Sequence, residues 1–294
     1  MSPEHVRERE SRWALPAALA AFAAVILMFL PGVVSSVSGT GEAEVLRSID
    51  EHGGSATLAS VLQAASFLLL AIPLVYLFLA ARARSERVLP AMLAIVIAAP
   101  LLIGAGTVLY SQAKQEAAES FVAGEAKPTI SAQDLKEKCE DEKPLAACEK
   151  EKREDDAASN ALSDASLTTL AGILTVGGGL LFAISLFYTC LWAMRVGLLS
   201  RFWGSLGMAL GIAVLLGFII LAIVWFLYLG LLYLGFLPGG KPPAWEEGEA
   251  VPWQTPGERA AAELEPSGTV EDGAAAEEGA AGEGSERRKR KQRE

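Results

Sequence analysis

The sequence predicts an all-α fold: a polytopic bundle of transmembrane helices with a helical extracytoplasmic insertion and a disordered C-terminal tail. The chain of 294 residues is 52% hydrophobic, yet it contains 25 basic and 35 acidic residues, so its apolar and polar parts must be segregated. Five runs carry no charged side chain, and each exceeds the roughly 20 apolar residues that cross a hydrocarbon core. These runs are residues 14–36, 57–81, 88–110, 167–194 and 202–237. Buried helices of a water-soluble protein are shorter and striped with polar residues.

The first run follows a basic segment, as the core of a secretory signal would. A signal core has about 7–15 apolar residues, whereas this run is much longer. Cleavage at the small residues 36–38 is the alternative, and the length of the run favours an uncleaved first span.

The placement of arginine predicts the orientation, because short loops rich in Lys and Arg remain in the cytoplasm. Arginines precede the first run, separate the second from the third, and follow the fourth: Arg7, Arg9, Arg12, Arg82, Arg84, Arg87, Arg195 and Arg201. The connections over residues 37–56 and 111–166 are acidic, and the second of them holds 14 acidic against 8 basic residues. We therefore expect residues 1–12 in the cytoplasm, three spans within residues 13–110, and an extracytoplasmic insertion over residues 111–166.

The last apolar run, residues 202–237, is too long for one upright span. As a single helix its 36 residues would measure about 54 Å against a core of about 30 Å. It forms either one tilted helix or a hairpin of two short spans that breaks near Gly217. The hairpin is favoured, which gives six spans, alternatively five, with spans four to six over residues 167–237. The side of the C-terminus depends on this choice.

The insertion predicts two polar helices. Ser131 can cap the first, with Asp134 three residues later completing a pair that resembles a capping box. Pro144 ends this helix, and a second one is expected over residues 145–165.

Two of the three cysteines, Cys139 and Cys148, flank the turn between these helices. In an oxidising compartment they are expected to form a disulfide that contributes about 2–3 kcal/mol. A redox-active pair is disfavoured because the spacing is not C-x-x-C. Metal binding is disfavoured because the two histidines, His5 and His52, lie far from the thiols in the sequence.

A smaller outer element is expected before the second span. Its apolar residues fall at helical spacing, with Thr40 as N-cap and Gly53-Gly54 as the stop. They are Val45, Leu46 and Ile49. The pattern predicts a short amphipathic helix on the outer surface.

The apolar runs contain no Asp, Glu, Lys, Arg or His. This weighs against ion-coupled transport and against acid–base catalysis at membrane depth, so no enzyme activity and no cofactor are expected. The Gly207-x-x-x-Gly211 motif allows close helix packing, either within the bundle, which is favoured, or between two copies of the chain. Gly177-Gly178-Gly179, together with Pro73, Pro90 and Pro100, indicates bends that could line a cavity.

The tail, residues 238–294, is rich in Gly, Pro, Ala and Glu and cannot bury a core, so disorder is expected. Four tryptophans are expected to anchor the chain at the membrane interface: Trp13, Trp203, Trp245 and Trp253. A basic cluster near the C-terminus is a candidate for anionic lipid headgroups: Arg287, Arg288, Lys289, Arg290 and Lys291. Nucleic acid is disfavoured as a partner because the tail holds 13 acidic against 8 basic residues.

Residues 195–253 contain the motifs R-x-x-G-x-x-G-x-x-x-G, at 201–211, and P-P-A-W, at 242–245. This stretch, about a fifth of the chain, resembles the C-terminal half of multi-pass membrane proteins of high-GC bacteria that share a domain of unknown function. The resemblance implies a bacterial inner membrane and a final pair of helices, and it transfers no catalytic residue.

We expect a non-enzymatic interaction or scaffold protein of the bacterial cytoplasmic membrane. Besides the lipid bilayer, its expected partner is another membrane or extracytoplasmic protein, bound through the outer helical hairpin. The alternative is a carrier or sensor of a small lipophilic ligand in a cavity between bent helices. A lipid-modifying enzyme is the least favoured role.

Overall fold

The structure is a computed structural model that describes residues 2–140, 144–215 and 219–253, which belong to one compact unit. These residues contain helices and no strand, which confirms the all-α class. The helices are α1 (Pro3–Val34), α2 (Glu42–Arg84), α3 (Met92–Val122), α4 (Ala132–Lys138), α5 (Leu145–Asp164), α6 (Thr168–Arg195), α7 (Arg201–Leu215), α8 (Ile219–Leu234) and α9 (Pro243–Glu247).

Four of the described helices, α1, α2, α3 and α6, are long and apolar enough to cross a membrane. Their most apolar windows have mean hydropathies between 2.1 and 2.5, and the helices contain most or all of the first four uncharged runs. These four runs are thereby confirmed as helices that are long and apolar enough to span a membrane.

The fifth run forms two helices rather than one. Trp203, near the start of α7, stacks on Tyr228 of α8 with ring centroids 3.7 Å apart, and the indole N–H of Trp225 donates to the Trp203 carbonyl at 3.0 Å. A straight helix could not bring residues 203 and 228 together, so α7 and α8 run antiparallel as the expected hairpin does. The expected break at Gly217 lies outside the described residues.

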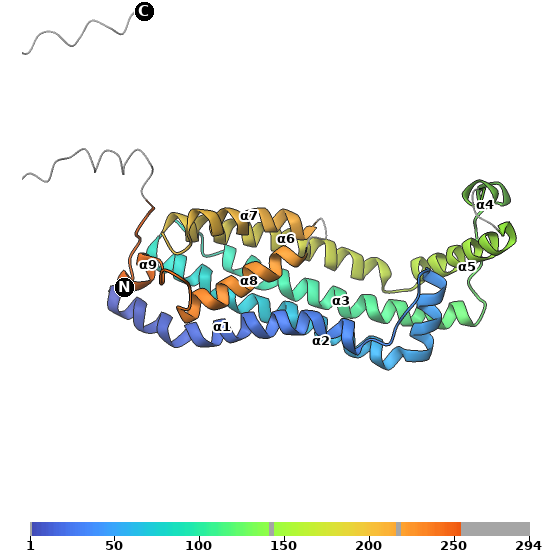
Figure 1. Cartoon of the computed structure of the whole chain (residues 1–294), viewed down its shortest axis with the longest axis horizontal. Helices are drawn as coiled ribbons and strands as arrows, with labels where there is room; N and C mark the ends of the chain where they lie inside the picture. Colours follow the sequence, from blue (N-terminus) through green and yellow to red (C-terminus); the bar gives the residue numbers. More distant parts are fainter. Residues whose placement is uncertain (1, 141–143, 216–218, 254–294) are drawn as a thin grey trace, which may run out of the picture. The chain divides into compact units, whose positions relative to one another are not determined.

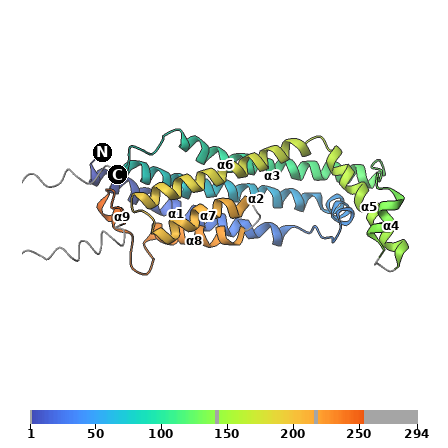
Figure 2. The same ribbon diagram turned by 90° about the horizontal axis from the view of Figure 1, so that it is seen from above.

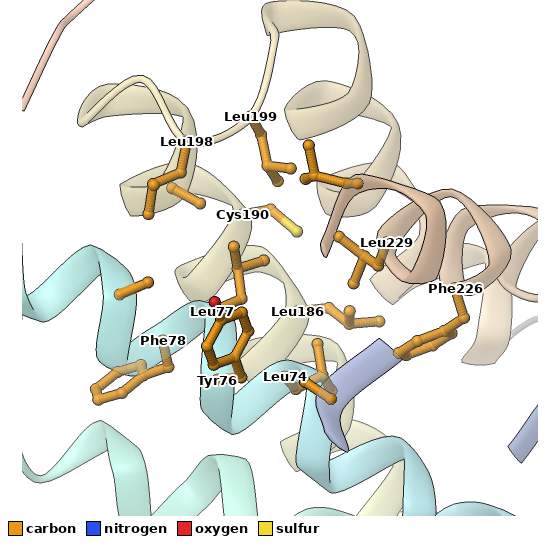
Figure 3. Packing of buried hydrophobic residues seen from close by; sticks show 14 of the residues in the cluster. Leu74, Tyr76, Leu77, Phe78, Leu186, Cys190, Leu198, Leu199, Phe226 and Leu229 are labelled. Atoms are coloured by element: carbon orange, nitrogen blue, oxygen red, sulfur yellow. The ribbon is translucent and has the colours of Figure 1, made fainter. Parts of the chain in front are cut away.

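Six helices form the bundle and pack in a closed order, α1–α2–α3–α6–α7–α8 and back to α1, with α2 also touching α6 and α8 (Figures 1 and 2). Their shared core is strongly apolar. Figure 3 shows side chains of α2, α6, α8 and the loop after α6 meeting around the buried thiol of Cys190. One end of this bundle, called the N-terminal end here, holds the start of α1. The opposite end carries a second, smaller core that belongs to the head described next.

The elements at that opposite end are called the head. They are α4, α5, the part of α2 before His52 and the part of α3 after Tyr110 (Figure 1). Its core consists mainly of small side chains: Ala43, Leu46, Ile49, Ala113, Ala117, Ala118, Ala158, Ala161 and Ala165. The predicted amphipathic character of residues 45–49 is present: Leu46 and Ile49 are buried in this core and Val45 is partly buried, whereas Arg47 is exposed.

One predicted boundary of that element is wrong, since the N-cap of α2 is Gly41 and not Thr40. The predicted stop at Gly53-Gly54 corresponds to a kink: His52 has the non-helical angles φ −125° and ψ 30°, and a second helical stretch follows directly within α2. The Gly53 carbonyl beside the kink accepts from the Thr57 hydroxyl at 2.9 Å and from the Gln115 side chain of α3 at 3.3 Å.

At the predicted bend of Gly177–Gly179, α6 continues without a break. A Cβ added at Gly178 would lie 2.9 Å from the backbone nitrogen of Ile103, so this glycine permits close packing of α6 on α3. Gly211 plays the same part between α7 and α6, since its Cβ would lie 2.8 Å from the Ala183 carbonyl oxygen. Gly207 likewise faces Cys190, so the motif serves packing within the bundle.

The tail was predicted to be disordered from residue 238, and this is wrong for residues 238–253. They return to the N-terminal end, where Val251 N–H donates to the Val196 carbonyl at 3.1 Å and Pro243 opens the short helix α9. Docking is possible because Trp245 and Trp253 supply large side chains, whose indole N–H groups donate to the carbonyls of Leu198 and Leu199. The basic cluster 287–291 lies outside the described residues.

Candidate functional site

The head is the candidate functional site, and its tip is a covalently closed turn. Cys139, at the end of α4, is bonded to Cys148 in the first turn of α5, with Cα atoms 5.9 Å apart, which confirms the predicted disulfide. The predicted cap of α4 is also present. The Asp134 N–H donates to Ser131 Oγ at 3.2 Å, and the Ser131 hydroxyl donates to the Asp134 carboxylate at 2.8 Å.

Helix α4 buries very little of itself. Of residues 131–140, only Leu135 and Cys139 are buried, and the charged side chains around them are exposed. A helix of seven residues is far below the length of about 12–15 at which isolated helices become marginally stable. The disulfide, the Ser131 cap and the single Leu135 anchor therefore hold it in place.

The helix α5 is tied to the start of α2 by two carboxylates. Asp155 accepts the Ala43 N–H at 3.1 Å, so it satisfies a backbone donor that the first turn of α2 leaves open. Arg47 pairs with Glu154 at 2.6 Å and also lies over the Phe121 ring, 5.4 Å from its centroid. The hydrogen bond from Arg47 holds the pKa of Glu154 below its ordinary value.

A third carboxylate of α5 fixes the loop between α3 and α4. Asp156 accepts the backbone N–H groups of Thr129 and Ile130, at 2.5 and 2.9 Å, and these bonds lower its pKa. Asn160 adds a hydrogen bond to the Lys127 carbonyl at 3.0 Å. The insertion is thus bonded at several points to helices that continue into the bundle.

The N-terminal end contains an ion pair that sequence reasoning missed. The Arg84 side chain is 0% exposed and that of Glu10 is 7% exposed, and their guanidinium and carboxylate are joined by two hydrogen bonds of 2.5 and 2.9 Å. Arg84 also donates twice to the Ala244 carbonyl. Glu10 was passed over because it lies among the basic residues that flank the first run, where solvent exposure is the usual expectation.

The four predicted anchor tryptophans have different surroundings. Trp13 is 59% exposed on α1, and Trp203 packs on Tyr228. Trp253 donates its indole N–H to the Leu199 carbonyl at 2.8 Å. Trp245 is only 8% exposed, stacks on Tyr76 and donates to the Leu198 carbonyl, so it anchors α9 to the protein and not to the headgroup layer.

The described residues contain no group of three or more His, Cys, Asp or Glu side chains that could hold a metal ion. A scan against protein-family models and searches of curated proteins and of solved structures found no match to this chain. The head presents charged side chains to solvent on helices that are fixed by hydrogen bonds and a disulfide.

Proposed function

We propose that the protein is a non-enzymatic interaction protein of the bacterial cytoplasmic membrane whose head binds a second membrane or extracytoplasmic protein. The observation that supports this role is helix α4. It adds one leucine and one cysteine to the buried part of the protein, yet it is capped and covalently fixed. The same constraints keep the insertion folded, and they also suit an element that meets a partner in one conformation, because pre-ordering lowers the entropic cost of binding.

The proposed topology places the N-terminal end in the cytoplasm and the head outside. The arginines Arg82, Arg84 and Arg87 support this orientation, and so does the disulfide, since such bonds persist in oxidising compartments. We take α7 and α8 as the fifth and sixth spans, short ones of about 22 and 24 Å. Because the hairpin starts and finishes at the N-terminal end, residues 243–253 lie in the cytoplasm in this scheme.

The alternative role, a carrier or sensor of a lipophilic ligand, relied on bends at Gly177–Gly179 and at Pro73, Pro90 and Pro100. The three glycines lie in an unbroken α6, and Gly178 packs closely on α3, so they give this role little support. The resemblance of the C-terminal stretch to bacterial membrane proteins adds no activity to either role.

Photo-crosslinking in intact cells tests the proposed function. A photoreactive amino acid replaces Lys136 on α4 and, as a control, Glu51 on α2; both side chains are exposed at the head end. We expect discrete adducts with one protein from position 136 and not from position 51. The same adducts should weaken when Cys139 and Cys148 are both changed to serine. Equal adduct patterns at the two positions, or none from α4, would contradict an interaction role for this helix.

A further inference from the structure

A groove between α1 and α2 at the N-terminal end has no part in the proposed function. Its volume is about 340 Å³, near the lower end of the range of about 300–1,000 Å³ for small-molecule sites. Its apolar lining comes from alanines and branched side chains of the two helices: Ala17, Ala71, Ile72, Val75, Leu79 and Ala80. The small side chains of Ala17, Ala71 and Ala80 leave space between α1 and α2 that larger side chains would fill.

The groove has the dimensions of one membrane leaflet. From Arg9 to Ala17 on α1 is a rise of about 12 Å, and from Ala71 to Ala80 on α2 about 13.5 Å. Half of a hydrocarbon core is about 15 Å. Ile72 and Leu79 on its rim are 39% and 37% exposed, so the groove opens toward the surface that faces lipid in this topology.

The polar end of the groove carries a free positive charge. Arg9, Trp13 and Ala17 lie four residues apart, on one face of α1. Arg9 is exposed, and among the described residues it has no hydrogen bond or ion pair. Glu10 also lines the groove, but its carboxylate is bound by both terminal nitrogens of Arg84, which offsets its charge.

We propose that this groove binds an anionic phospholipid of the cytoplasmic leaflet, with an acyl chain between α1 and α2 and the phosphate on Arg9. A planar guanidinium matches the geometry of phosphate oxygens, and Trp13 stands at the level where indole rings favour the headgroup layer. The unpaired positive charge at the mouth selects an anionic over a neutral lipid. A neutral lipid or a second copy of the chain is an outcome that the test below distinguishes.

The test uses the full-length protein in phosphatidylcholine vesicles with a minor fraction of phosphatidylglycerol. Bromine atoms, which quench tryptophan, are placed on the acyl chains of one lipid or the other. The signal of Trp13 is the difference between the protein and its Trp13→Phe variant. We expect brominated phosphatidylglycerol to quench Trp13 well beyond its share of the lipid. Equal quenching by the two lipids at equal lipid fraction would mean that the groove does not select between headgroups. No quenching by either lipid would mean that protein covers the groove. Either result overturns the proposal.

Matched variants separate a site from general attraction. Arg9→Gln should reduce the preference for phosphatidylglycerol roughly tenfold, as for the loss of one charge-assisted contact. Arg12→Gln removes the same charge from a residue that pairs with Glu8 at 2.5 Å and does not line the groove, so the preference should remain. If both variants lower it equally, surface charge explains the effect and the site is refuted.

A second pair of variants tests the apolar part. Ala71→Phe fills the groove and should abolish the selective quenching, whereas Ala65→Phe places the same ring on α2 outside the groove and should leave it unchanged. If Ala71→Phe retains the full preference, the acyl chain lies elsewhere and the proposal is wrong.

Discussion

Replacing Arg84 with methionine should destabilise the bundle more than any other single charge removal at the N-terminal end. The change leaves the Glu10 carboxylate, 7% exposed, without a counter-ion and takes two donors from the Ala244 carbonyl. Removing one partner of a buried pair costs about 3–5 kcal/mol because the other charge stays buried. At roughly 2–4 °C per kcal/mol, the unfolding midpoint should fall by roughly 6–20 °C.

The buried thiol of Cys190 provides the assay. Cys190 is 0% exposed and is free, whereas the other two cysteines are bonded to each other, so a thiol-reactive fluorophore reports the opening of the core around Cys190. The detergent-solubilised full-length protein is heated with the dye. Arg82→Met is the matched control, since Arg82 is an exposed arginine on the last turn of the same helix.

A double variant separates the ion pair from other effects of the substitution. Glu10→Met combined with Arg84→Met removes both charges, so it should be no less stable than Arg84→Met alone, and the two changes should be strongly non-additive. Additive losses, or an equal midpoint for Arg84→Met and Arg82→Met, would refute the reasoning that a buried ion pair holds α1, α2 and α9 together.

Three further predictions concern the head and the packing glycines. Changing Cys139 and Cys148 to serine should raise the rate of proteolytic cleavage in the head roughly 30- to 150-fold, which corresponds to a loss of about 2–3 kcal/mol; an unchanged rate would mean that the disulfide does not restrain the tip. Because the pKa of Asp156 is lowered in the folded head, its contribution is present above about pH 4 and is lost as the pH falls through that lowered pKa, so Asp156→Asn should flatten the acid dependence of head proteolysis below about pH 4. Gly211→Ala should lower the thermal midpoint because the added Cβ would lie 2.8 Å from a carbonyl oxygen. Gly177→Ala meets nothing within 4 Å and should raise the midpoint, because alanine favours a helix by about 1 kcal/mol over glycine. The opposite order of the two midpoints would contradict the packing role of Gly211.

The sequence predicts well what local patterns determine. Four apolar runs are long enough to predict membrane-spanning helices, and all four form helices of the required length and apolarity. The cap at Ser131 and the start of α5 after Pro144 depend on neighbouring residues only, so their geometry follows from residue type. The disulfide could be expected because the two cysteines flank a predicted turn.

What the sequence could not predict depends on contacts between distant residues. Glu10 and Arg84 are 74 positions apart, and neither differs locally from an ordinary flanking charge. Trp245 looked like an interfacial anchor because nothing in the tail indicates the site formed by Tyr76, Arg84 and Leu198. The Gly53 carbonyl beside the kink in α2 likewise has a partner, Gln115, that lies 62 positions away.

The most direct test of the central claim, a head fixed outside the membrane, is the labelling of intact cells with a membrane-impermeant maleimide, with and without an impermeant reductant. Mass spectrometry scores each of the three cysteines. The account predicts that Cys139 and Cys148 are labelled only after reduction and that Cys190, buried in the bundle, stays unlabelled. Labelling of Cys139 and Cys148 only after the cells are opened would place the head in the cytoplasm and contradict the account.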